Sequence, residues 1–288
     1  MKKIAVVDIK GGFGNQVFQV AFSFFLESNG YKVFLNYEYF DLNNSRSLIL
    51  RGDDFRLQKV DKIKISSFKL FNRLSLSNKV PKLIKELLSR FFLKIKSTEE
   101  FKHINQLPNF LFCKGYFQDL SYLDSFRTEF EQYLQKKFKI MKVSKNFITS
   151  SNTLLHIRRT DYVDMGEELN LDFYTKAISY CSEKVPNFEF DIFTDDLNWV
   201  KDNDVFKNAA NIFEKKEDHY TDEATETLNT FLAMLNYDNY IIGNSTYSLM
   251  AYEFSHSSNK KVIVAKPWFR NRFFGNIYPS DSIFIENL

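Results

Sequence analysis

The sequence predicts an α/β protein built from two Rossmann-like halves, and two observations support this prediction. Near the N-terminus, an apolar segment, a glycine turn, a segment of helical length and a second apolar segment follow one another within residues 3–37. In the second half, short apolar segments alternate with segments of helical length. A strand–helix–strand unit favours a parallel, right-handed crossover. Repeated alternation is typical of an open parallel sheet.

The N-terminal elements can be placed individually. The first strand is expected at "KIAVVDI" (3–9), and "GGFG" supplies the turn after it. "NQVFQVAFSFFLESNG" has helical length and ends in Gly30, a residue type that commonly terminates helices. "YKVFLNY" (31–37) then alternates as a strand does. The pattern is weaker from about residue 40 to 150, where we expect a helical insertion.

Strands and helices alternate more clearly in the second half. Apolar periodicity lapses near residues 146–152, so we expect a domain boundary there. The expected elements are strands at 153–157, 188–194, 240–244 and 260–265, and helices at 173–184, 226–238 and 247–256.

Composition limits the class of protein. The 288 residues, 44% of them hydrophobic, can form two domains with a sizeable core. A net charge of +3, from 39 basic and 36 acidic residues, is too even to indicate a nucleic-acid partner. Cys113 and Cys181 are far apart and lack a C-x-x-C partner, which fits a reduced compartment without a thiolate metal site. Asp8 interrupts the N-terminal apolar run, and no apolar stretch reaches the ~18 residues of a membrane span, so we expect a cytoplasmic protein.

"GGFGNQ" (11–16) lies where a strand meets a helix, so its backbone amides and the helix dipole can bind an anion. It departs from the dinucleotide-binding pattern because Val17 occupies the position of the third glycine. A tight turn without a ligand is the simpler interpretation, although two amide side chains at the helix start favour ligand contact. The candidate residues are Gly12, Gly14, Asn15 and Gln16.

"HIRRTDY" follows the apolar "NTLL", where a buried strand should end. Charged groups are costly to desolvate, so this cluster needs a partner. Side chains alternate along a strand, which places His156 and Arg158 on one face and Arg159 on the other. Ligands bind at the carboxyl ends of strands in such sheets, and a guanidinium group suits a phosphate. The competing interpretation is a structural ion pair, either Arg159–Asp161 or Arg158–Asp195.

Two further strand ends carry polar residues. "FTDD" offers Asp195 and Asp196, which can bond a ribose or guanine, accept a proton or hold a metal; capping of the next helix by Asp195 is the alternative. "IIGNSTYS" offers a phosphate cradle in Asn244, Ser245 and Thr246, with helix capping again the alternative. The later "DND" follows a helical segment, so we interpret it as a solvated turn and not as a metal-binding D-x-D.

The ordered motifs "GGFGNQVFQVAF", "HIRRTDYV", "FTDDLNWV" and "YIIGNSTYS", followed by "VIVAKPWF", resemble those of the bacterial α-1,2-fucosyltransferases. The resemblance runs from residue 11 to about 269, and its His-x-Arg-Arg element is shared more loosely with α-1,6- and protein O-fucosyltransferases. It implies an inverting enzyme that uses GDP-β-L-fucose and has a GT-B fold, with two Rossmann-like domains facing a cleft. The domains would be an acceptor-side domain at 1–148 with a helical insertion and a GDP-fucose-binding domain at 149–288.

The resemblance also implies roles for individual residues. By motif position, Arg158 would hold the diphosphate, with His156, Asp195 and Asp196 near the nucleoside. The glycine loop would face the cleft near the fucose. The family is metal-independent, so we expect no metal and no cofactor besides the donor, GDP-fucose. The remaining donor-binding candidates are Arg159, Asn244, Ser245 and Thr246.

The chain departs from the family pattern at four positions. Leu249 and Met250 replace two tryptophans, and Tyr237 and Asn239 replace a cysteine and a histidine. These differences are expected to affect packing behind the last loop, and so to bear on acceptor preference more than on the donor.

Without a metal, a positioned arginine and loop amides must stabilise the departing diphosphate. Inversion also requires a base for the acceptor hydroxyl, and Asp161 is the first candidate among several carboxylates. The expected activity is that of a galactoside α-1,2-fucosyltransferase acting on an O-antigen or another surface polysaccharide. Two alternatives stay open: a fucosyltransferase of α-1,6 or protein O-fucosyl type, and a non-catalytic module that binds a nucleotide sugar or glycan.

Residues 78–96 have the pattern of an amphipathic helix, with apolar residues on one stripe, six basic residues and Glu86 as the only acid. Such a helix can lie on an anionic membrane near a lipid-linked, galactose-containing acceptor. The simpler interpretation is a helix packed on the N-terminal domain with a basic solvated face. Peripheral contact with the inner face of the cell membrane is therefore the alternative to a purely cytoplasmic location.

Overall fold

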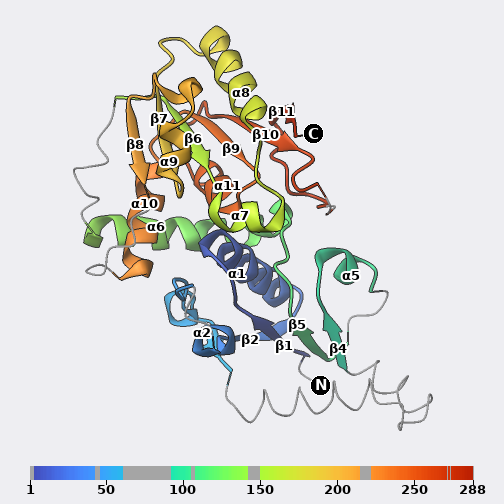
Figure 1. The fold of residues 1–288 in the computed structure, drawn as a ribbon. Coiled ribbons are helices and arrows are strands. Elements are labelled where there is room, and N and C mark those ends of the chain that lie inside the picture. Colours follow the sequence, from blue (N-terminus) through green and yellow to red (C-terminus); the bar gives the residue numbers. More distant parts are fainter. Residues whose placement is uncertain are drawn as a thin grey trace. The chain divides into compact units, whose positions relative to one another are not determined.

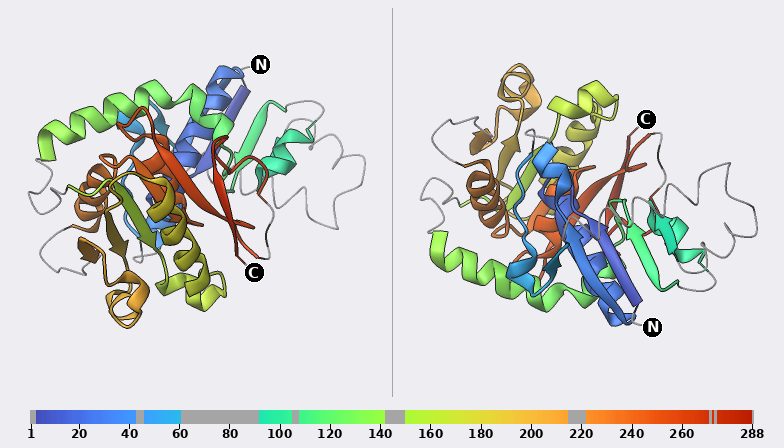
Figure 2. Two further views of the ribbon diagram at one scale, coloured as in Figure 1. Left: turned by 90° about the horizontal axis from the view of Figure 1, so that it is seen from above. Right: turned by 90° about the horizontal axis from the view of Figure 1, so that it is seen from below.

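The computed structural model describes residues 3–42, 46–60, 92–104, 108–141, 150–214, 222–270, 272 and 274–287. The chain divides into two compact units, an N-terminal unit (Met1–Tyr133) and a C-terminal unit (Leu134–Leu288). Each unit contains one parallel β-sheet with helices connecting its strands (Figures 1 and 2). The predicted α/β class with two parallel sheets is therefore confirmed.

The sheet of the N-terminal unit has five strands in the order β3-β2-β1-β5-β4, all parallel. β1 occupies the centre because its middle residues, Ala5, Val6 and Val7, are apolar and fully buried. It pairs with β2 on one side and β5 on the other. The strands are β1 (Lys3–Asp8), β2 (Tyr31–Asn36), β3 (Gln58–Lys59), β4 (Phe92–Ile95) and β5 (Phe110–Cys113).

Helix α1 connects β1 to β2 and confirms the predicted strand–helix–strand unit (Figure 1). It ends at Ser28, and Gly30, two residues later, has a φ of +82°, the left-handed conformation that a glycine adopts without strain. Its buried side is aromatic, and Phe22 stacks on Phe117 with ring centroids 4.1 Å apart. The helices that begin in this unit are α1 (Phe13–Ser28), α2 (Glu38–Leu42), α5 (Thr98–Lys102) and α6 (Arg127–Met141).

The predicted helix at 78–96 is wrong at its C-terminal end, because Phe92–Ile95 form β4. Parallel pairing with β5, which buries Phe92 and Ile95, outweighs the helical periodicity of the sequence there. Residues 61–91 lie outside the described residues, so membrane contact by the rest of the segment stays a prediction. The expected helical insertion also missed β5, the strand beside β1.

The sheet of the C-terminal unit has six parallel strands in the order β11-β10-β9-β6-β7-β8. The four predicted strands are β6, β7, β9 and β10, which form its centre. The two edge strands, β8 and β11, escaped prediction because they are short and only partly buried. The strands are β6 (Thr153–Ile157), β7 (Phe190–Thr194), β8 (Asn211–Glu214), β9 (Asn239–Gly243), β10 (Lys261–Lys266) and β11 (Ile283–Glu286).

The three helices predicted in this half correspond to α8, α10 and α11. A core around Leu155, Ile192 and Phe173 packs helix α8 against the sheet. The "DND" triplet lies in a turn after α9 with both aspartates exposed, as predicted. The helices are α7 (Thr160–Met165), α8 (Leu171–Lys184), α9 (Leu197–Lys201), α10 (Glu223–Met234) and α11 (Thr246–Glu253).

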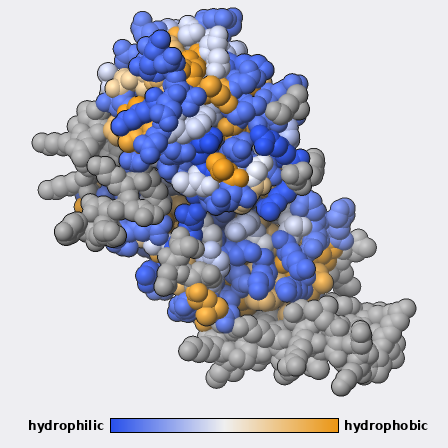
Figure 3. All heavy atoms as spheres, viewed as in Figure 1, coloured by the Kyte–Doolittle hydropathy of each residue, from blue (hydrophilic) through white to orange (hydrophobic). Residues whose placement is uncertain are grey.

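The division between the units falls at Tyr133–Leu134, inside helix α6. The boundary expected near 146–152 falls largely on residues 142–149, which are outside the described part of the chain. On the face that Figure 3 shows, the described surface is mainly hydrophilic, with apolar side chains in small separate groups. Within the described ranges, no helix is both long enough and apolar enough to cross a bilayer.

Candidate functional site

Three loops of the C-terminal unit hold the predicted donor-site residues. They follow strands β6, β7 and β9, which are neighbours in a parallel sheet, so their carboxyl ends lie at one edge (Figure 1). Direct contacts join the loops. The guanidinium group of Arg158 reaches Asp195, and the Tyr162 hydroxyl donates to the Asn244 carbonyl oxygen at 3.3 Å.

Arg158 lies between two carboxylates. Its Nη1 is 2.8 Å from Asp195 Oδ2, and its Nη2 is 2.7 Å from Asp161 Oδ1. The Asp195 side chain is 8% exposed, whereas that of Asp161 is 44% exposed. Arg158 therefore has one buried partner and one that solvent or a ligand can reach. The Arg158–Asp195 ion pair, which the sequence left as an alternative to ligand binding, is present.

Asp195 holds the end of β7 against the start of α7. Its Oδ1 accepts the Arg159 N–H at 2.8 Å, and its Oδ2 accepts the Thr160 hydroxyl at 2.7 Å. Burial alone would raise the pKa of Asp195, but Arg158 and these hydrogen bonds outweigh burial and lower it. The carboxylate therefore stays ionised near neutral pH and fixes Arg158.

Asp196, and not Asp195, caps helix α9. Its Oδ1 accepts the Trp199 N–H at 3.0 Å, because the helix begins one residue later than expected, at Leu197. Its Oδ2 lies 3.1 Å from Nε of Arg159, whose guanidinium group is 4.2 Å from the centre of the Trp199 ring. Arg159 therefore pairs with Asp196, and not with Asp161 as the alternative interpretation of the sequence had it. Arg159 and Asp196 join the β6 and β7 loops to helix α9.

His156 is buried beside Arg158. It is 8% exposed, and its Nδ1 has no hydrogen-bond partner among the described residues. Burial lowers the pKa of His156 to about 4, although Asp195 opposes the shift, so the ring is neutral near pH 7. Buried polar atoms are normally paired, so an unpaired imidazole nitrogen next to a cation is a place where a ligand can bond.

The loop between β9 and α11 has a fixed backbone. Gly243 has a φ of +60°, where a side chain would be strained, and a Cβ there would force Leu169 Cδ1, 2.4 Å away, to move. Asn244 donates from Nδ2 to the Glu167 carbonyl oxygen at 2.8 Å and so shapes the loop. Ser245 is the N-cap residue but makes no side-chain capping bond, and Thr246 begins α11. Backbone N–H groups at the start of a helix favour an anion, so the start of α11 is a candidate contact for a diphosphate.

Arg270 and Glu167, which the sequence analysis did not identify, hold the C-terminal end of helix α7 in place. The Arg270 N–H donates to Glu167 Oε2 at 2.7 Å, and its guanidinium group donates to the carbonyl oxygens of Gly166 and Glu168, each at 3.0 Å. Glu167 is 5% exposed, so this carboxylate is paired within the fold. In the sequence, the only indication of a role for Arg270 was its position directly after the motif "VIVAKPWF".

The four positions that depart from the family pattern lie in the interior, as expected. Leu249 and Met250 are fully buried in α11, and Asn239 is 8% exposed. The Tyr237 hydroxyl donates to the buried Asp191 at 2.7 Å. These side chains pack behind the loop.

The predicted glycine loop belongs to the N-terminal unit. Gly11, with a φ of +76°, takes the left-handed conformation, whereas Gly12 is the N-cap residue of α1 and Gly14 lies in the first turn of that helix. Asn15 Oδ1 accepts a hydrogen bond from Gln118 Nε2 at 2.7 Å. Gly11 is therefore the residue that forms the turn.

Gln16 is fully buried, and its amide is used within the unit. Its Nε2 donates to the carbonyl oxygens of Gly11 and Ser47 at 3.1 and 2.9 Å. Its Oε1 accepts the N–H groups of Ile49 and Leu50 at 2.9 and 3.2 Å. Gln16 therefore positions the backbone at 47–50, and direct contact of this residue with a ligand stays a prediction.

In the part of the chain that the structure describes, no three His, Cys, Asp or Glu side chains are placed to hold a metal ion. Cys113 and Cys181 are both buried and free, and burial raises the pKa of each thiol. Metal independence stays a prediction that requires an activity measurement.

Two α/β units, each with one parallel sheet, are the architecture of GT-B glycosyltransferases. The chain belongs to glycosyl transferase family 11, which matches residues 1–285. It is 27% identical over 305 residues to an alpha-1,2-colitosyltransferase of Escherichia coli, covering 96% of each chain.

Two further likenesses agree with this assignment. The chain is 27% identical over 297 residues to the Escherichia coli O-antigen biosynthesis glycosyltransferase WbnK, covering 91% of this chain and 93% of that protein. It resembles the crystal structure of the fucosyltransferase NodZ from Bradyrhizobium with a TM-score of 0.50, at 11% identity over 94% of this chain and 97% of that one. The likeness to NodZ concerns the fold alone.

Proposed function

We propose that the protein transfers L-fucose from GDP-β-L-fucose to the 2-hydroxyl of a galactoside in a surface glycan such as O-antigen. The observation that carries this proposal is Arg158, held by Asp195 at the end of β6 beside the unpaired Nδ1 of His156. Membership of glycosyl transferase family 11 supports it, as do relatives named for α-1,2 transfer and for O-antigen biosynthesis.

Cleavage of the bond between fucose and the diphosphate leaves negative charge on GDP. Arg158 would take part of that charge through its planar pair of N–H donors, and the N-terminal amides of α11 would take another part. Asp195 stays ionised and keeps the guanidinium group in place. The neutral His156 would form a hydrogen bond with the donor through its unpaired nitrogen.

Asp161 is our candidate for the base. It is bound to Arg158 at 2.7 Å, so its carboxylate becomes available when the diphosphate takes its place on the arginine. The acceptor hydroxyl would then give its proton to Asp161 while its oxygen bonds to C1 of fucose from the face opposite GDP, which converts the β-linked donor into an α-linked product. Donor binding and base release would thus be one event.

The relative named as a colitosyltransferase supports a second candidate, in which the same site transfers a colitosyl group. The two candidates share the diphosphate site and differ in the sugar that the enzyme accepts.

A donor panel tests both candidates. GDP-fucose and GDP-colitose are each incubated with methyl β-D-galactoside and lactose, and the product linkage is determined by NMR. We expect an α-1,2-fucosyl galactoside with one GDP released for each sugar transferred. Transfer from GDP-colitose alone would establish the second candidate. Binding of GDP-fucose without turnover of either donor would indicate a non-catalytic module.

A further inference from the structure

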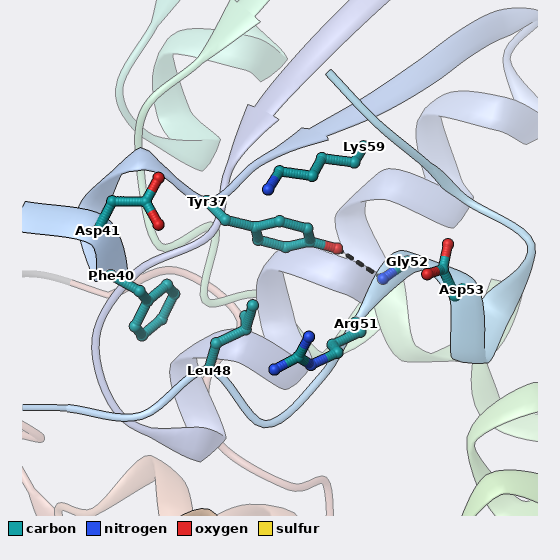
Figure 4. Close-up of a pocket in the computed structure, with 8 residues that line it drawn as sticks. All are labelled: Tyr37, Phe40, Asp41, Leu48, Arg51, Gly52, Asp53 and Lys59. Atoms are coloured by element: carbon teal, nitrogen blue, oxygen red, sulfur yellow. Dashed lines mark hydrogen bonds between the residues drawn. The ribbon is translucent and has the colours of Figure 1, made fainter. Parts of the chain in front are cut away.

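A cavity of about 280 Å³ lies in the N-terminal unit, lined by residues between Tyr37 and Lys59 (Figure 4). It is at the carboxyl ends of two parallel strands, since Tyr37 follows β2 and Lys59 ends β3. Ligands bind at this edge of open α/β sheets. The volume is at the lower end of the range of about 300–1,000 Å³ for small-molecule sites, so it suits a sugar ring and not a whole nucleotide sugar.

The apolar surface of the cavity is rigid. Tyr37 is 7% exposed, and its hydroxyl accepts the Gly52 N–H at 2.5 Å, as the dashed line in Figure 4 shows. Burial raises the pKa of Tyr37 to about 12, so the phenol stays neutral. A Cβ on Gly52 would lie 2.3 Å from the Leu57 carbonyl oxygen, so only glycine allows this approach. Phe40 and Leu48, both half-buried, add to the apolar surface.

Four exposed charged side chains surround this apolar surface: Asp41, Arg51, Asp53 and Lys59. None of them forms an ion pair with another residue of the described chain. Two carboxylates and two cations give no net charge, which disfavours an anionic or cationic ligand. The Lys59 ammonium already lies over the Tyr37 ring, 5.8 Å from its centre. The remaining donors and acceptors around this aromatic base suit a neutral, polyhydroxylated ligand whose C–H face packs on the ring.

Gln16 connects the cavity to the glycine motif. Its four hydrogen bonds fix Gly11 and the backbone at 47–50, and that backbone carries Leu48 and leads directly to Arg51. The amide of this motif therefore acts as a positioning residue for one side of the cavity.

We propose that the cavity bounded by Tyr37, Phe40, Asp41, Leu48 and Arg51 binds a neutral pyranose of the acceptor glycan. The identity of that sugar as a galactoside rests on the proposed function. Recognition itself rests on the aromatic base, the unpaired charged groups and the volume described above.

Binding without a donor tests the proposal. Saturation-transfer NMR and titration with methyl β-D-galactoside and with lactose compare the parent with Asp41→Asn and Arg51→Gln, both changes at exposed side chains. The matched control is Asp124→Asn, an exposed aspartate outside the cavity. We expect the parent and the control to bind alike, and each cavity variant to bind about ten- to a hundredfold more weakly, as the loss of a charged hydrogen bond implies.

Steady-state kinetics separate this proposal from the proposed function. We expect KM for the galactoside to rise in the cavity variants by a similar factor, and KM for GDP-fucose to stay at the parent's value. Galactoside binding that both variants weaken, in a protein that transfers no fucose, would support the cavity and refute the function. Fucose transfer with an unchanged galactoside KM in both variants would refute the cavity. A parent that binds neither galactoside would also refute it.

Discussion

The buried His156 makes the stability of the C-terminal unit depend on pH. Its folded pKa is about 4, against 6.5 for an unfolded histidine, because burial disfavours the charged ring. Between these values the unfolded chain binds more protons than the folded one, so stability rises with pH through that window and is lost as pH falls. The full shift corresponds to about 3 kcal/mol, and about 2.5 kcal/mol of it is lost between pH 7.5 and 4.5.

His156→Gln isolates this contribution, because an amide retains hydrogen-bonding capacity but does not titrate. Urea unfolding is followed at pH 7.5 and 4.5 by tryptophan fluorescence, which reports on the C-terminal unit because Trp199 and Trp268 both belong to it. The parent should lose about 2.5 kcal/mol more than the variant over this range. Groups remote from His156, such as Asp8, are common to both proteins and cancel in the difference. Asp195, whose pKa His156 helps to lower, is a neighbour that the substitution also affects. Parallel pH dependences would show that the ring is not held neutral, and the site description would fail.

Three further changes test other parts of the structure. Arg159→Lys loses the Nε bond to Asp196 and the contact with the Trp199 ring. It should therefore lower the free energy of unfolding by about 1–2 kcal/mol in thermal melting, with a smaller fall in turnover than Arg158→Lys causes. A parent-like melting temperature would contradict this. Gly115→Ala places a Cβ 2.1 Å from the Lys96 carbonyl oxygen, so it should lower the free energy of unfolding by about 1–3 kcal/mol. The Cβ of Gly12→Ala has no atom within 4 Å, so this control variant should unfold like the parent. Transfer activity should survive excess EDTA, because an arginine and helix amides are proposed to stabilise the diphosphate; loss of activity that Mn²⁺ restores would contradict this.

Much of the fold could be predicted because the central strands are short apolar runs bounded by polar turns. The middle residues of β6, β7, β9 and β10 are buried on both faces, so their sequences are mostly apolar. Strand β4 escaped prediction because of its helical periodicity. The residues of β4 continue a helical stripe, and only pairing with β5 turns them into a strand. Tertiary pairing of this kind leaves no local signal.

The sequence predicted which residues lie at the strand ends of the site, but not which side chains pair with one another. The alternation of "HIRR" separates Arg158 from Arg159, and the structure gives the two arginines different carboxylates. Because α9 begins one residue later than expected, the helix is capped by Asp196 and not by Asp195. The role of Gln16 depends on contacts with residues more than 30 positions away, which the local motif does not contain.

The central claim is that Arg158 binds the donor diphosphate as negative charge develops on it. Arg158→Lys keeps the charge and can keep one carboxylate contact, but it loses the planar pair of donors that now spans Asp161 and Asp195. The direct test measures kcat for GDP-fucose transfer together with the thermal melting temperature. We predict a fall in kcat of about 10²–10³, or roughly 2.7–4 kcal/mol, with a small change in melting temperature. A variant that turns over like the parent but melts much lower would show that Arg158 is a structural bridge and would contradict the claim.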